Sequence, residues 1–228
     1  MSAPAWPLHE GAVTEMRQES KQADLEKLEF IEVLDHYRKI LKSKTVKPIV
    51  VGHSMGGLIA QILLSEGFAQ AAEAIDSAPP NGMTVLKWSF IKSNWGVVSP
   101  FASKEEPINL DVDQFSYAFL NAQDPATTRK IYDEFYVPES RQLGKGPTSD
   151  AGEINPNVSR GPLLIFAGGE DHIIPAKLNL KNFNMYGKSP AHTEFKFFDE
   201  RDHWTVAGPG WEKVADQVDR WIKDRYAQ

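Results

Sequence analysis

Two kinds of hydrophobic spacing alternate along this chain, and together they predict strands that lead into helices. Short apolar runs rich in β-branched or small residues are typical of buried parallel strands, and they occupy residues 48–52, 71–77, 162–167 and 194–198. Apolar residues three or four positions apart are typical of amphipathic helices, and they occupy residues 24–42, 55–66, 177–186 and a final stretch in which Trp211, Val214, Val218, Trp221 and Ile222 form one stripe. The alternation predicts an α/β fold, with a mostly parallel sheet and helices on both of its faces.

Asp24 is the expected N-cap of the first helix, because its side chain can accept a hydrogen bond from the first helical turn. Between the second and third predicted strands the pattern changes. Residues 83–160 carry scattered aromatic side chains and short helical periods, with helices predicted at 111–122 and 125–136. We predict one domain, residues 1–228, in which 83–160 forms an inserted helical cap. The alternative is an ordinary excursion of the core with no role over a pocket.

Ser54 lies between a predicted strand and a predicted helix, in the sequence Gly52-His53-Ser54-Met55-Gly56-Gly57. Gly-x-Ser-x-Gly in this context is the pattern of a nucleophile elbow, a sharp turn that holds the serine in a strained conformation. We expect glycine at 52 and 56 because the turn leaves no room for side chains there. The small residue at 57 lets the helix pack close to the strands.

Composition narrows the classes of partner. The chain has 228 residues, a net charge of −6 and an isoelectric point near 5.6, so clustered basic residues for a nucleic acid are not expected. It has no cysteine, which excludes disulfides and thiolate chemistry. Neither a signal peptide nor an apolar stretch long enough to span a bilayer is evident. We therefore expect a cytoplasmic protein with a small-molecule partner.

Three predicted strand ends carry the residue types of a catalytic triad. A serine hydroxyl is a poor nucleophile at neutral pH, so it needs a base within hydrogen-bond reach and an acid that orients the base. Such groups gather at the carboxyl ends of parallel strands. Ser54 follows strand 48–52, Asp171 follows strand 162–167 and His203 follows strand 194–198. The chain order Ser, Asp, His is the order found in α/β-hydrolases.

Four further histidines have no metal-ligand spacing with one another or with carboxylates, so a metal site is not expected. They are His9, His36, His53 and His192. His172 is expected to pack or to form a local hydrogen bond. We expect no metal and no cofactor.

The sequence resembles the α/β-hydrolase superfamily, in its cap-bearing serine esterase-like branch. The resemblance is carried by residues 52–57, by Gly169-Glu170-Asp171-His172-Ile173-Ile174-Pro175 and by Asp202-His203-Trp204, and it runs over nearly the whole chain. It implies Ser54 as nucleophile, His203 as general base and then acid, and Asp171 as the orienting acid. The backbone N–H of Met55 would be one donor to the oxyanion. Asp76 is a rival acid, since some relatives place the carboxylate at that strand end.

The resemblance also implies a departure. Members of the superfamily have several strands ahead of the loop that resembles residues 2–7, and a loop between two of them supplies a second oxyanion donor. Fewer than fifty residues precede Pro48. We therefore expect an N-terminally truncated fold whose elbow strand lies at a sheet edge, where unpaired backbone groups invite homo-oligomer formation. Loss of one oxyanion donor typically lowers turnover by about 10² to 10³, so we expect impaired activity, in a shortened form of a longer gene product or in a naturally truncated member.

Three functions fit these observations. The first is hydrolysis of a small, fairly apolar ester or lactone through an acyl-enzyme. The second is a non-catalytic or weakly active relative that acts in binding or assembly. The third is C–C bond cleavage or a cofactor-free peroxidase reaction on the same triad, because a fold does not determine the reaction.

Overall fold

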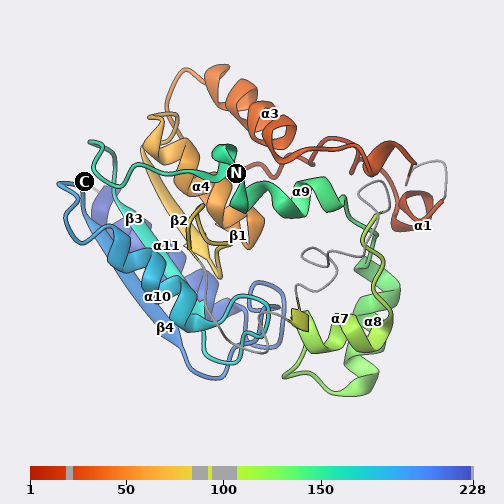
Figure 1. Ribbon diagram of the computed structural model, residues 1–228. Helices are drawn as coiled ribbons and strands as arrows, with labels where there is room; N and C mark the ends of the chain where they lie inside the picture. The colour runs from red at the N-terminus through yellow and green to blue at the C-terminus, as the bar shows by residue number, and fades with distance from the viewer. Residues whose placement is uncertain (19–22, 84–91, 94–106, 227–228) are drawn as a thin grey trace.

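A parallel four-stranded sheet forms the centre of the molecule (Figure 1). This computed structural model describes residues 1–18, 23–83, 92–93 and 107–226. The strands are β1 (Ile49–His53), β2 (Ala71–Ile75), β3 (Leu163–Gly168) and β4 (Thr193–Phe198), and they lie in the order β1-β2-β3-β4. Each lies within two residues of a predicted strand, so the predicted parallel α/β sheet is confirmed.

The helices follow the predicted alternation. In chain order they are α1 (Val13–Met16), α3 (Phe30–Lys42), α4 (Met55–Ser65), α7 (Val112–Phe119), α8 (Pro125–Phe135), α9 (Arg141–Lys145), the 3₁₀ turns η1 (Gly146–Thr148) and η2 (Asp150–Gly152), α10 (Ala176–Met185) and α11 (Glu212–Tyr226). Within the described residues, no helix combines the length and the apolar character that crossing a bilayer requires.

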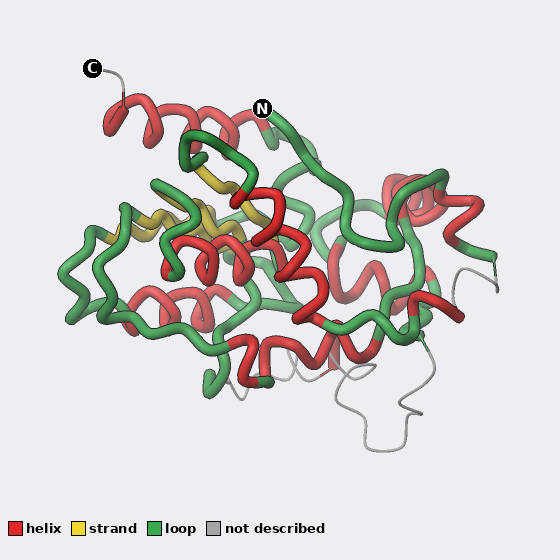
Figure 2. The backbone as a smooth tube through the Cα atoms, turned by 90° about the horizontal axis from the view of Figure 1, so that it is seen from above, coloured by secondary structure: helices red, strands yellow, loops and turns green. Residues whose placement is uncertain are grey.

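Helices cover both faces of the sheet, as predicted. On one face, α4 and α10 pack against small or branched strand residues such as Ala74 and Ile165, and α3 contributes to the same buried cluster as α4. On the other face, α11 inserts Val214 and Trp221 against β2 and β3. Figure 2 shows the strands between this C-terminal helix and the helices of the opposite face.

Two local expectations were wrong. Helix α3 begins at Phe30 and not at residue 24, because the chain is extended at Glu29 (φ −98°, ψ 154°). The Glu29 N–H donates to the carboxylate of Glu32 at 2.8 Å, so Asp24 is not the N-cap of α3. Trp211 precedes α11 and is 45% exposed, so it does not belong to the apolar stripe of that helix.

The described part of the connection between β2 and β3 is helical. Helices α7 and α8 agree with the two helices predicted there, and they stand apart from the sheet in Figure 1. Asp111 and Asp124 cap them, each accepting hydrogen bonds from the first-turn backbone. Trp88, Phe90, Trp95 and Phe101 of the predicted cap lie outside the described residues. The bounds 83–160 of that cap stay a prediction.

Among the strands that the structure describes, β1 lies at an edge of the sheet, as predicted. Within the described residues it pairs only with β2. The Pro48 carbonyl and the Ser54 N–H bond to the β2 side, so in a parallel ladder Ile49, Val51 and His53 turn their backbone groups to the open side. The Val51 side chain is 48% exposed.

Glu73, an ionisable residue, lies at the centre of β2 on the face that α11 covers. It is fully buried, and neither carboxyl oxygen has a hydrogen-bond partner in the described part of the chain. Burial raises its pKa to about 8, against the opposing effect of Arg225. The folded protein therefore holds a proton on Glu73 at pH values where the unfolded chain, with a glutamate pKa of about 4.3, has released it.

Glu73→Gln is expected to stabilise the protein in a pH-dependent way. Because the folded state of the parent binds the extra proton, its free energy of unfolding falls as the pH rises from about 4.3 to about 8, by at most about 5 kcal/mol. The glutamine variant lacks this loss, so the difference between the two proteins should grow over that window and then level off. Urea unfolding at pH 5, 7 and 8 measures it, with the exposed Glu134→Gln as control. Parallel curves for the parent and Glu73→Gln would contradict the assignment.

Candidate active site

Ser54 occupies the sharp turn between β1 and α4. Its backbone has φ 56° and ψ −121°, one of few positive φ values at non-glycine residues in the described chain. Such a conformation costs about 1 to 3 kcal/mol and persists only where the surroundings hold it. Here the Ser54 N–H donates to the Ile75 carbonyl at 2.9 Å, and the Ser54 carbonyl accepts from the Ala78 N–H at 2.9 Å. The geometry is that of the predicted elbow.

The glycines around the serine differ in how much room they have. A Cβ at residue 52 would lie 2.0 Å from the Gly56 carbonyl oxygen, and one at residue 57 would lie 2.8 Å from Cβ of Ser77. A Cβ at residue 56 would meet no described atom within 4 Å. The expected steric need for glycine therefore holds at 52 and 57, whereas at 56 no atom of the described residues requires it.

Asp171 and His203 form a buried pair. His203 Nδ1 lies 2.6 Å from Asp171 Oδ2, and the two residues are 1% and 0% exposed. The other oxygen of Asp171 accepts the Ile174 N–H at 2.7 Å, which fixes the carboxylate. With a proton on Nδ1 donated to Asp171, His203 keeps Nε2 as an acceptor. This is the tautomer that a general base requires.

Asp76, the rival acid, has a different partner. Its Oδ1 accepts the Gly168 N–H at 2.6 Å, and its Oδ2 is buried without a partner in the described part of the chain. Burial, reinforced by the nearby Asp171, raises the pKa of this carboxyl well above its ordinary value. The geometry thus favours Asp171 as the residue that orients His203.

His53 contacts the base from the nucleophile side. Its Nε2 lies 2.8 Å from the His203 carbonyl oxygen, and the two rings lie 4.5 Å apart. Burial lowers the pKa of both imidazoles to about 3, so both are neutral at neutral pH and His53 Nε2–H can donate. No role was expected for His53, although its position next to Ser54 brings it beside the base.

The last contact of a triad is not formed in this structure. His203 Nε2 is buried and has no hydrogen-bond partner among the described residues, Ser54 included. Catalytic hydrogen bonds in ligand-free enzymes are often long and tighten when substrate binds. The structure therefore brings Asp171 to His203 and leaves the serine–histidine contact open.

Met55, the expected oxyanion donor, is the first residue of α4, so helical geometry leaves its N–H without an intrahelical acceptor.

The β2–β3 connection contacts the loops that carry the acid and the base. His172 packs, as expected, against the Tyr117 ring at 4.7 Å, and its Nδ1 lies 2.9 Å from the Tyr117 carbonyl, 55 residues away in sequence. Asn121 Nδ2 donates to the Glu170 carbonyl at 2.8 Å. The Phe119 ring lies 5.5 Å from the His203 ring. Helix α7 and the turn after it thus form one wall of the candidate site.

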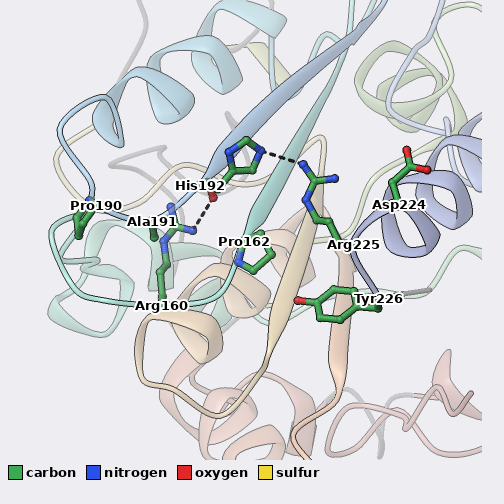
Figure 3. Close-up of a pocket in the computed structure, with 8 residues that line it drawn as sticks. All are labelled: Arg160, Pro162, Pro190, Ala191, His192, Asp224, Arg225 and Tyr226. Carbon is green, nitrogen blue, oxygen red and sulfur yellow. Dashed lines mark hydrogen bonds between the residues drawn. The ribbon is translucent and has the colours of Figure 1, made fainter. Parts of the chain in front are cut away.

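A surface pocket lies at the opposite, amino end of β3 and β4 (Figure 3). Its lining comes from the residues before these strands and from the end of α11: Arg160, Pro162, Pro190, Ala191, His192, Asp224, Arg225 and Tyr226. Its guanidinium groups already have protein partners, since Arg160 donates to the Gly161 carbonyl and Arg225 pairs with Glu194. In the described residues no group of three or more His, Asp or Glu side chains could hold a metal ion.

Comparisons with known proteins agree with this architecture. The solved structures that resemble it include a monoacylglycerol lipase from Paleococcus ferrophilus, 20% identical, with a TM-score of 0.61 over 86% of this chain and 75% of that chain. A methylesterase from Arabidopsis is 10% identical, with a TM-score of 0.59 over 84% and 77%. A pyrethroid hydrolase from Sphingobium faniae is 14% identical, with a TM-score of 0.58 over 88% and 79%. At these identities the likeness concerns the fold.

A search of curated proteins found no match. The sequence itself matches the Alpha/beta hydrolase family over residues 3–217, nearly its full length. Together with the parallel sheet, this match establishes that the chain belongs to the α/β-hydrolase family.

Proposed function

We propose that this protein is a serine hydrolase that cleaves a small, fairly apolar ester or lactone through an acyl-enzyme, without a cofactor. The observation that carries the proposal is the buried Asp171–His203 hydrogen bond beside an elbow that holds Ser54 at a positive φ. A structural histidine has no need of a buried carboxylate partner together with a second ring nitrogen that has no partner among the described residues and lies next to a strained serine.

Each residue has a role in the proposed reaction. His203 Nε2 removes the proton of Ser54 as Oγ attacks the acyl carbon, and Asp171 stabilises the imidazolium that forms. The Met55 N–H donates to the oxyanion. His203 then gives the proton to the leaving alcohol, and the acyl group stays on Ser54. A water molecule, activated by the same imidazole, releases the acid and restores the serine.

The aromatic side chains next to the base support an apolar substrate. Phe119 faces His203, and behind it Phe115, Leu120 and Tyr136 form a buried cluster against which Trp204 packs. Apolar walls with a few polar groups are the usual form of a small-molecule site. Two of the similar solved proteins are named as a lipase and a methylesterase, and both names denote ester hydrolysis.

Labelling with a fluorophosphonate probe tests the proposal. We expect the parent protein to become labelled at Ser54, and Ser54→Ala to lose both labelling and ester turnover by a factor of about 10⁴ to 10⁶. Ser65→Ala, at the other end of α4, is the matched control and should keep the parent rate. No labelling of a folded parent, or equal labelling of Ser54→Ala, would contradict serine hydrolysis.

A second candidate is a binding or assembly role through the open edge of β1. The observation that favours it is the unpaired outer side of β1 with the half-exposed Val51, since such an edge can pair with the same edge of a second copy. A protein with this role alone would not react with the probe. Sedimentation that shows a dimer in an unreactive parent would support this candidate over the first.

A further inference from the structure

The side chain of Asp202, next to the base, joins two parts of the molecule that are distant in sequence. We propose that Asp202 is a positioning residue that ties the α7–α8 turn to the loop of His203 and so holds the imidazole in register with Ser54. The inference rests on the proposed hydrolase function and concerns a residue that takes no chemical part in the proposed reaction.

Three N–H groups converge on the two oxygens of Asp202. Its Oδ2 accepts from the Ala122 N–H and from Gln123 Nε2, both at 3.1 Å, and its Oδ1 accepts from the Trp204 N–H at 3.1 Å. The residue is 3% exposed. A carboxylate suits this arrangement because it only accepts, whereas an asparagine would turn an NH₂ group toward at least one of these donors.

The position of Asp202 makes it the link between the two segments. Ala122 lies 80 residues away in sequence, in the turn that follows α7. On the other side, Asp202 accepts the Trp204 N–H, and this hydrogen bond spans His203, the residue between them. The His203 carbonyl oxygen in turn lies 2.8 Å from His53 Nε2. The same turn also reaches the acid loop, through Asn121 and the Glu170 carbonyl. A shift of α7 and α8 is therefore transmitted to the base through the Asp202 carboxylate.

The charge of Asp202 also acts on the base. It raises the pKa of His203, against the larger lowering that burial causes. The titratable groups that face this pair from the neighbouring elements are His53 on β1, Asp76 after β2 and Asp171 after β3. Removing the charge at Asp202 should lower the pKa of His203 further.

Kinetics of Asp202→Asn, Gln123→Ala, the double variant and the exposed control Glu134→Gln test the inference in the full chain. We expect Asp202→Asn to lower kcat and the rate of fluorophosphonate labelling by about ten- to a hundredfold, with KM changed by less, because misplacement of the base affects the chemical step. Gln123→Ala should lower kcat by a smaller factor, and the double variant should be no slower than Asp202→Asn. The acidic limb of kcat/KM should move to lower pH, by about one unit, in Asp202→Asn only.

The outcomes separate this inference from the proposed function. If the parent neither turns over esters nor reacts with the probe, both the proposed function and the inference about Asp202 are wrong. A reactive parent, with an Asp202→Asn variant that keeps the parent kcat and pH limb while it loses only stability, overturns the inference and leaves the function standing. A parent-like Gln123→Ala combined with a shifted limb in Asp202→Asn also overturns it, because the charge and not the tie to the turn would then be responsible.

Discussion

Asp171→Asn is expected to lower kcat by about 10⁴, the size of the loss when the orienting acid of a Ser-His-Asp triad becomes an amide. Asp171 accepts the Nδ1 proton of His203 at 2.6 Å, and both residues are buried. An amide nitrogen at the same place would favour a proton on Nε2 and turn the lone pair of Nδ1 toward residue 171. Nε2 could then no longer accept the proton of Ser54.

Asp76→Asn is the matched comparison, since Asp76 is also a buried carboxyl at the end of a strand. Asp76 accepts the Gly168 N–H and makes no hydrogen bond to His203, burial raises its pKa, and an amide oxygen at the same place can still accept the Gly168 N–H. Its positive φ of 40° suits asparagine. We expect kcat to stay within about tenfold of the parent.

Ester turnover and probe labelling at neutral pH measure both variants, after circular dichroism has shown that each is folded. The assignment of the acid fails if Asp76→Asn is the slower of the two. Near-parent turnover by Asp171→Asn would likewise show that His203 is oriented by another group.

Gly52→Ala is expected to lower both stability and reactivity. Its new Cβ would lie 2.0 Å from the Gly56 carbonyl oxygen, which belongs to the first turn of α4 and cannot rotate away. Relief requires β1 and the start of α4 to separate. We expect a loss of about 3 kcal/mol or more in the free energy of unfolding and, because Ser54 moves with the turn, a loss of about 10² in labelling rate.

Gly56→Ala, two residues after the serine, is expected to behave differently. No atom of the described residues lies within 4 Å of this Cβ and residue 56 is helical, so alanine should be neutral or stabilise α4 by up to about 1 kcal/mol. Urea unfolding together with labelling rates tests both glycine variants. A Gly56→Ala variant as damaged as Gly52→Ala would show that a segment outside the described residues fills this space.

Local patterns in the sequence were sufficient for the strands, for the longer helices apart from the start of α3, and for the order of the candidate triad residues. An apolar run such as 162–167 can only be buried, and Ser54, Asp171 and His203 each follow such a run, so the parallel sheet brings their loops to one edge. The elbow motif alone does not show that residue 56 must be glycine, because a motif states which residue is common and not how much space surrounds it.

The features that the sequence did not reveal depend on contacts between distant segments. Asp202 obtains its partners from a turn 80 residues away, and nothing in its own neighbourhood distinguishes it from a surface aspartate. Glu73 reads as an outward-facing residue in AAEAI, and it is buried only because α11, from the other end of the chain, covers that face of β2. Helix α3 starts late because Leu25 and Leu28 enter the core before the helix begins.

Because β1 lies at the sheet edge, its backbone amides next to the nucleophile should fall into two classes of hydrogen-exchange rate. Val50 and Gly52 direct their N–H groups toward β2, whereas Ile49, Val51 and His53 direct theirs to the open side. In deuterated solvent the second set should exchange early, and the amides of β3, which has a strand on each side, should exchange last. The strand that carries Ser54, like the other edge strand β4, would then open before the central strands, so that loss of the nucleophile's geometry would precede global unfolding.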